Sequence, residues 1–184
     1  MSIERGAEYY DKYYSDEALS YYKHYSASEY YEMWKKVLAL IPNVKIDIFE
    51  IGCGPGQFAQ MLCEERKEIF YTGIDFSEVA IKEAKRINPA LYTQLFCKDA
   101  YTAKIKNDCM VVSLETFEHL NDFKIIDQIP LGVELIFTIP DFDQPSHVRY
   151  FKNIAEIVFR YHQKINFTHI EKFQRWFICK GVTI

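Results

Sequence analysis

The sequence predicts an α/β fold: a doubly wound, mostly parallel seven-stranded sheet with helices on both faces and a C-terminal antiparallel hairpin. Beyond residue 43, short apolar runs alternate with helical patterns, which is typical of parallel strands joined by crossover helices. The chain closes with two β-rich runs that have no helical pattern between them, as expected for a hairpin. With 184 residues, 49% of them hydrophobic, the chain can bury the core of one domain.

The individual elements follow from local patterns. Apolar residues at helical spacing predict a helix over 28–40, with Ser28 as its N-cap. A second helix is expected to begin near Ser77 and to stop at Asn88. The buried face of a third is expected to be Phe151, Ile154, Ala155, Val158 and Phe159. The expected parallel strands are 46–51, 69–74, 92–97, 109–114 and 133–139, and the expected hairpin strands are 165–170 and 176–184.

Composition limits the expected location and partners. Five cysteines without a C-x-x-C pair argue against a disulfide framework or a cysteine zinc site and favour a reducing compartment. The chain shows no signal-peptide pattern and no apolar run of about 18 residues, so we expect a cytoplasmic protein without a membrane span. The net charge is −4, divided as −9 over residues 1–145 and +5 over 146–184. The acidic total argues against a large nucleic-acid interface, and the basic end is interpreted as a solvated surface.

The strongest chemical signal is a glycine-rich turn that directly follows the first predicted strand. Gly52, Gly54 and Gly56 stand where a backbone must approach a ligand closely or take a positive φ. Asp75 follows at the end of the next strand, where a carboxylate can accept both ribose hydroxyls of an adenosine. The two features together predict an adenosine-containing cofactor.

The spacing of this loop resembles that of the class I S-adenosylmethionine-dependent methyltransferases, since a dinucleotide loop would read G-x-G-x-x-G. The resemblance implies that Glu50 helps to organise the loop and the ammonium group of S-adenosylmethionine. It also implies that Asp75 binds the ribose, Phe76 the adenine face, and the Asp99–Ala100 turn the adenine edge. Glu115, at the end of the fourth strand, would line the pocket beside the sulfonium. The implied cofactor-binding residues are Glu50, Gly52, Gly54, Gly56, Asp75, Phe76, Asp99, Ala100 and Glu115.

The N-terminal 42 residues are expected to form a tyrosine-rich helical cap on a methyltransferase domain that spans residues 43–184. Nine of the 14 tyrosines lie within residues 1–31. They are interpreted either as packing residues or as an aromatic lid that excludes water from the cofactor, with Tyr21 and Tyr25 as the expected contacts. The helix-spaced tyrosines are Tyr10, Tyr14, Tyr21 and Tyr25.

Glu115, Glu118 and His119 form an E-x-x-E-H run that resembles the run in metal-dependent O-methyltransferases, including ubiquinone-pathway enzymes and small-RNA 2′-O-methyltransferases. A helical turn would place positions i, i+3 and i+4 on one face, so these three residues are candidate ligands for Mg²⁺ or Mn²⁺. His147 could add a further contact, which makes His119, Glu118 and His147 the candidate catalytic residues. His119 could instead be a general base or have only a structural role.

The sequence therefore predicts a methyltransferase that acts on the hydroxyl group of a small molecule. The alternatives are a 2′-O-methyltransferase for an RNA end, a nicotinamide-dependent oxidoreductase, and a cofactor-binding regulatory protein without activity. The acceptor and the oligomeric state stay open.

Overall fold

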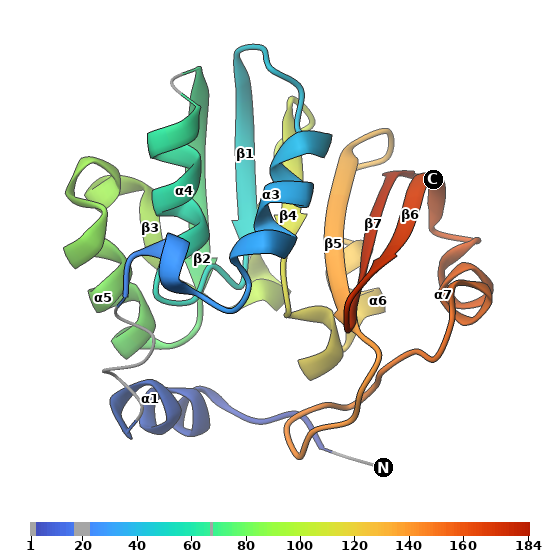
Figure 1. Cartoon of the computed structure of the whole chain (residues 1–184), viewed down its shortest axis with the longest axis horizontal. Helices are drawn as coiled ribbons and strands as arrows, with labels where there is room; N and C mark the ends of the chain where they lie inside the picture. The colour runs from blue at the N-terminus through green and yellow to red at the C-terminus, as the bar shows by residue number, and fades with distance from the viewer. Residues whose placement is uncertain (1–2, 17–22, 67) are drawn as a thin grey trace.

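A computed structural model describes residues 3–16, 23–66 and 68–184. Its seven strands form one sheet in the order β3-β2-β1-β4-β5-β7-β6 (Figure 1). Strands β1 to β5 run parallel, while β7 pairs antiparallel with both β5 and β6, which confirms the predicted fold class. The strands are β1 (Ile46–Ile51), β2 (Ile69–Asp75), β3 (Leu95–Cys97), β4 (Cys109–Ser113), β5 (Glu134–Pro140), β6 (Ile165–Phe173) and β7 (Trp176–Thr183).

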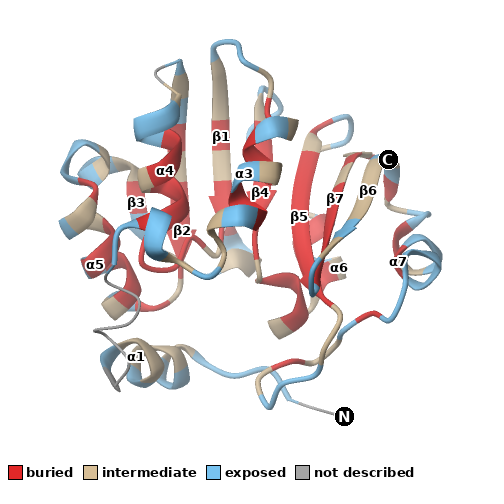
Figure 2. Ribbon diagram, viewed as in Figure 1, coloured by how far each residue is buried: buried red, intermediate tan, exposed pale blue. Residues whose placement is uncertain are grey.

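Helices cover both faces of this sheet, because successive strand residues point to opposite sides. Val112 belongs to a hydrophobic cluster that includes residues of α3, α4 and α5, whereas its neighbour Val111 belongs to one that includes residues of α6 and α7. Figure 2 shows the buried residues concentrated on the central strands. The α-helices are α1 (Ala7–Asp16), α3 (Tyr31–Leu40), α4 (Gln57–Glu65), α5 (Glu78–Ile87), α6 (Asp122–Ile126) and α7 (Ile154–Tyr161). The 3₁₀ helices are η1 (Tyr25–Ala27), η2 (Pro89–Gln94), η3 (Ala100–Thr102) and η4 (Phe117–His119).

Two predicted boundaries are wrong. The first long helix begins at Tyr31, because Ser28 closes η1 through a bond from its N–H to the Tyr25 carbonyl and does not cap α3. The third strand begins at Leu95, because Pro89 opens the 3₁₀ helix η2, which takes up residues 92–94. Helix α5, in contrast, begins near Ser77 as predicted, and the Ser77 hydroxyl caps it by accepting a hydrogen bond from the Ala80 N–H.

The buried face of α7 also differs from the prediction. Ile157 and Tyr161 are its buried residues, while four of the five predicted ones, Ile154, Ala155, Val158 and Phe159, are exposed. The phenol of Tyr161 donates a 2.6 Å hydrogen bond to the buried Asp122. This contact turns the i, i+4 pair of Ile157 and Tyr161 toward the sheet. Phe151, which precedes the helix, is buried as predicted.

Helix α1 lies across the edge of the sheet at which the parallel strands end (Figure 1). Asp11 holds it there by accepting hydrogen bonds from the Ser77 hydroxyl at 2.6 Å and from the Val79 N–H at 3.2 Å. These bonds join α1 to the first turn of α5. Among the described residues, no helix has the length and the apolar character needed to cross a membrane.

Candidate functional site

The loop after β1 is held at the carboxyl end of the sheet by its own backbone. Gly52, Gly54 and Gly56 all have positive φ angles of 74°, 50° and 80°. The N–H of Gly52 donates to the carbonyl of Ile74 at 2.9 Å, which ties the loop to β2. A Cβ atom on Gly52 would lie 2.3 Å from the Thr116 hydroxyl oxygen, whereas one on Gly54 would point toward the Tyr14 phenol at 3.1 Å. Glycine is therefore required by conformation throughout the loop and by close contact at Gly52.

Asp75 fastens the end of β2 to the same loop. Its carboxylate accepts hydrogen bonds from the N–H groups of Gly54 and Ser77, both at 2.9 Å. Burial raises the pKa of Asp75 to about 6, although the two N–H donors act in the opposite direction. A carboxylate placed in this way can also accept hydrogen bonds from a ligand in the adjoining cavity.

Glu50 is a second buried acid near the glycine loop. It accepts a hydrogen bond from the Tyr71 phenol, which also lies close to Cys53. Burial raises the pKa of Glu50 to about 8. A ligand ammonium group beside Glu50 would favour the charged form of the side chain.

A cavity of about 580 Å³ opens beside these residues, a volume typical of small-molecule sites. Glu50, the loop residues Gly52 and Gly54, and Asp75 line it, together with the predicted adenine-side residues Phe76, Asp99 and Ala100. Asp99 is exposed and caps η3 by accepting from the Tyr101 N–H at 2.8 Å. Gly56 is not among the lining residues; it begins α4 and packs against α5. The predicted cofactor residues other than Gly56 thus border one cavity.

Aromatic side chains from the N-terminal region form the opposite wall of the cavity. Tyr25, a predicted contact, is instead buried in the core, and its phenol donates to Glu65 at 3.3 Å. Tyr21 lies outside the described residues. The sequence signal for the observed wall was the i, i+4 spacing of Tyr10 and Tyr14 on α1. The aromatic residues of this wall are Tyr9, Tyr10, Tyr13, Tyr14, Tyr30 and Trp34.

Glu115 lies in the cavity wall in a conformation that the sequence did not predict. Its φ is +50°, so the expected helical turn from Glu115 to His119 does not form, and only Phe117–His119 forms a 3₁₀ turn. The Glu115 carboxylate accepts hydrogen bonds from the Thr138 hydroxyl at 2.9 Å and from the Trp176 indole at 2.7 Å. Burial raises its pKa to about 7.

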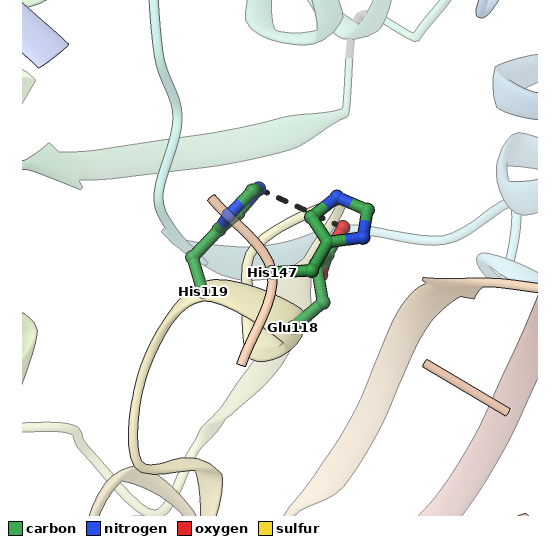
Figure 3. Close-up of side chains that lie close together, drawn as sticks. All are labelled: Glu118, His119 and His147. Atoms are coloured by element: carbon green, nitrogen blue, oxygen red, sulfur yellow. Dashed lines mark ion pairs between the residues drawn. The ribbon is translucent and has the colours of Figure 1, made fainter. Parts of the chain in front are cut away.

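Glu118, His119 and His147 also line the cavity, and their side chains come close together. One ligand atom from each lies within 4.8 Å of the others, and Figure 3 shows the three side chains gathered around one point. This group includes His147 in place of Glu115, which the sequence had placed beside Glu118 and His119. Both carboxylate oxygens of Glu118 are buried, and neither has a hydrogen-bond partner among the described residues. Burial raises the pKa of Glu118, with a further contribution from Glu115.

Both imidazoles present the same ring nitrogen to this cluster. His119 Nδ1 lies 3.1 Å from the Ser146 carbonyl, and His147 Nδ1 lies 3.1 Å from the Phe142 carbonyl. A carbonyl only accepts, so each Nδ1 carries the proton and each Nε2 keeps a lone pair. Burial supports this state by lowering the pKa of His119 to about 4 and by lowering that of His147.

Arg149 holds together the two segments that carry these residues. Its guanidinium donates to the carbonyls of Phe117 and Leu120, which flank Glu118 and His119 along the chain. The adjoining Val148 N–H donates to the Glu118 carbonyl at 2.7 Å. Arg149 was not a predicted site residue, because its partners, the carbonyls of Phe117 and Leu120 and the carboxylate of Asp122, are distant from it in the sequence.

Comparisons with known proteins agree with this geometry. The family model described as a methyltransferase domain matches residues 48–129. The malonyl-[acyl-carrier protein] O-methyltransferase of Priestia megaterium is 29% identical over 102 residues, which are 52% of this chain and 37% of that enzyme. The chain thus matches well under half the length of that relative.

Solved structures show the same fold. A protein from Pyrococcus horikoshii superposes with a TM-score of 0.72 at 14% identity, covering 94% of this chain and 99% of the other. The N-methyltransferase NodS from Bradyrhizobium japonicum, in complex with S-adenosyl-L-homocysteine, gives a TM-score of 0.62 at 16% identity, covering 85% and 88%. Residues 48–129 of the chain thus match a methyltransferase domain, and the strand order and the cavity at the glycine loop agree with that match.

Proposed function

We propose that this protein is an S-adenosylmethionine-dependent methyltransferase that methylates a hydroxyl group of a small molecule. The observation that carries the proposal is one cavity with two chemically different ends. One end has the glycine loop and Asp75. The other has Glu118, His119 and His147, whose free acceptor atoms point to one place. Residues 1–42 are proposed as the cap of this cavity and residues 43–184 as the methyltransferase domain.

The residues at the first end fit the cofactor. The cavity surface at Gly54 is backbone, so a ligand can lie against the loop at a distance that a side chain would prevent. Asp75 would accept hydrogen bonds from the ribose hydroxyls, Phe76 would cover one face of the adenine, and Glu50 would face the ammonium group. The bound cofactor supplies a methyl group already activated on a sulfonium.

The residues at the second end fit a divalent cation. Two imidazole lone pairs and one unpartnered carboxylate give a donor set with two nitrogens and oxygen from Glu118. Because His147 replaces Glu115 in this set, it suits Mn²⁺ or a related transition metal better than the oxygen-preferring Mg²⁺. A cation held there would lower the pKa of an acceptor hydroxyl.

The chain itself orients the reactants. Alignment would be the main requirement, because the cofactor would supply a methyl group that is already activated and the acceptor oxygen would have to lie in line with it. The hydroxyl proton must leave during this transfer. In the absence of a cation, the Nε2 lone pair of His119 accepts it, because Nδ1 is already committed to the Ser146 carbonyl.

Two measurements test this function. Calorimetry with S-adenosylhomocysteine should show binding in the micromolar range, and no heat at millimolar ligand would contradict the cofactor assignment. Methyl transfer to hydroxyl compounds should stop with a chelator and return with Mn²⁺. Full activity in excess chelator would leave His119 as the base and remove the cation from the proposal.

Variants locate the cation. Glu118→Ala and His147→Asn should abolish Mn²⁺ binding, measured by calorimetry, and should keep the affinity for S-adenosylhomocysteine. His162→Asn is the matched control, since that imidazole is exposed and lies outside the cavity. Unchanged Mn²⁺ binding in both cavity variants would show that the cation binds elsewhere.

A further inference from the structure

In the part of the chain that the structure describes, three buried side-chain oxygens without a hydrogen-bond partner belong to residues that line the same cavity. They are the two carboxylate oxygens of Glu118 and the phenol oxygen of Tyr10. Buried polar atoms are nearly always paired in folded proteins, because an unpaired one loses its hydration without compensation. Such atoms in a cavity wall therefore indicate where a polar group of a ligand binds.

Tyr10 comes from the N-terminal helix and not from the sheet. Its ring centroid lies 5.2 Å from that of Phe76 and 5.8 Å from that of His119. The ring thus contacts both the proposed adenine residue and the proposed proton acceptor. Asp11, the next residue, fixes this part of α1 to the start of α5. The position of the phenol is consequently set by the fold.

We propose that Tyr10 binds the methyl acceptor, and that the phenol and Glu118 together recognise a hydroxyl group. This inference rests on the proposed methyltransferase function and adds the residue and the acceptor class that the site selects. The N-terminal helix is then part of the acceptor site as well as a cover over the cofactor.

The chemistry of the two groups selects a hydroxyl over a carboxylate. The Tyr10 phenol carries one proton and can donate it. Glu118 and the imidazole Nε2 atoms offer acceptors. A hydroxyl can accept from the phenol and donate to one of these atoms at the same time. A carboxylate has no proton to donate and would add negative charge beside the buried Glu118.

Tyr10→Phe isolates the phenol oxygen, because it keeps the ring that contacts Phe76 and His119. Tyr92→Phe is the matched control, since that tyrosine is exposed and lies outside the cavity. Binding of catechol and of benzoate is titrated by calorimetry to protein saturated with S-adenosylhomocysteine. Saturation itself is measured first, so a failure to bind S-adenosylhomocysteine refutes the proposed function before the acceptor is tested.

Catechol should bind the wild type and Tyr92→Phe equally, and Tyr10→Phe about three- to tenfold more weakly, as expected for one lost hydrogen bond. Affinity for S-adenosylhomocysteine should be the same in all three proteins. If the substitution disturbed folding in general, this affinity would fall as well. Benzoate should bind more weakly than catechol. Equal catechol affinity in Tyr10→Phe, stronger binding of benzoate, or no catechol binding to the wild type would each overturn the proposal.

Discussion

Arg149 forms an ion pair with the fully buried Asp122, at 3.4 Å between Nη2 and Oδ1. Asp122 also accepts two 2.7 Å hydrogen bonds from Arg160 and one from Tyr161, so its charge is balanced in the core. Arg149 is thereby anchored at one end while its other nitrogen donates to the carbonyls around Glu118 and His119. The ion pair therefore connects α6 and α7, which meet at Asp122, to the loop that carries His147.

We predict that Arg149→Lys disrupts the Glu118 cluster without affecting the cofactor end. Lysine keeps the charge but cannot donate to Asp122 and to two carbonyls in a fixed geometry. Each carbonyl left unpaired should lower the free energy of unfolding by about 1–3 kcal/mol. Mn²⁺ affinity should fall and affinity for S-adenosylhomocysteine should persist. Arg86→Lys, a substitution at an exposed guanidinium on α5, is the control, and normal Mn²⁺ binding by Arg149→Lys would refute the anchoring role.

Asp75 should make cofactor binding depend on pH. Ribose hydroxyls donate to the ionised carboxylate, so protonation below about pH 6 should weaken the binding of S-adenosylhomocysteine. The loss should approach about tenfold per pH unit, the limit for one group. Asp75→Asn should remove this dependence, and Asp75→Ala should weaken binding at neutral pH by about 1.5–3 kcal/mol. Calorimetry between pH 5 and 8 measures both effects. If the affinity of Asp75→Asn depended on pH as steeply as that of the wild type, the pH dependence would come from another group.

The same carboxyl should influence the stability of the ligand-free protein with the opposite dependence on pH. Its pKa rises from 3.8 to about 6 on folding, so the folded state binds the proton more tightly. The Asp75 contribution to stability is therefore present at low pH and is lost as the pH rises from about 4 to about 6. The free energy of unfolding is measured with urea for the wild type and for Asp75→Asn at each pH. The difference between the two should show this decline. A difference that stays constant with pH would contradict the raised pKa.

Helix α1 should become more ordered when the cofactor binds. Tyr10 and Tyr14 line the cavity, and Asp11 attaches α1 to α5 by accepting hydrogen bonds from the Ser77 hydroxyl and the Val79 N–H. Amide hydrogen exchange of residues 7–16 should slow with S-adenosylhomocysteine, while exchange in β6 should not change. Asp11→Asn should reduce the protection. Equal exchange of residues 7–16 with and without ligand would leave α1 with a packing role only.

Gly52 and Gly132 provide a matched test of the glycine loop. Both have positive φ, 74° and 83°, so alanine should be strained at either position, by about 1–2 kcal/mol. At Gly132 no atom of the described residues, apart from the glycine and its chain neighbours, lies within 4 Å of an added Cβ, whereas at Gly52 the Thr116 hydroxyl is 2.3 Å away. Gly52→Ala should therefore lower the free energy of unfolding more than Gly132→Ala, by about a further 1–3 kcal/mol. Equal losses would show that Thr116 moves away at little cost.

Local sequence patterns were sufficient to predict the sheet and the cofactor end of the site. The strand patterns and the glycine loop each depend on residues that are close together in the sequence. Asp75 is likewise recognised by its place at the end of a strand. The α7 face was mispredicted because Ile157 and Tyr161 face inward through a contact with Asp122, which is 39 residues away from Tyr161. A helical pattern alone cannot reveal such a partner.

The acceptor end depended on contacts that are distant in the sequence. Glu115 was predicted beside Glu118, but the Trp176 indole, 61 residues later, and Thr138 bind its carboxylate. His147 takes the place beside Glu118 because Arg149 docks its loop onto η4. Neither contact leaves a trace in the hydrophobic periodicity of the sequence. Residue spacing alone therefore predicted a helical turn from Glu115 to His119, which does not form.

Strand β7 is synthesised after β6 but lies between β5 and β6 in the sheet. On the ribosome, β5 therefore has an open edge until the last strand emerges, and β6 cannot reach its place first. Trp176, which binds Glu115, is at the start of that last strand. The nascent chain can form the Asp75 side of the cavity earlier than the Glu115 side. Its dependence on chaperones should accordingly be greatest during the interval in which residues 134–140 lack their neighbour.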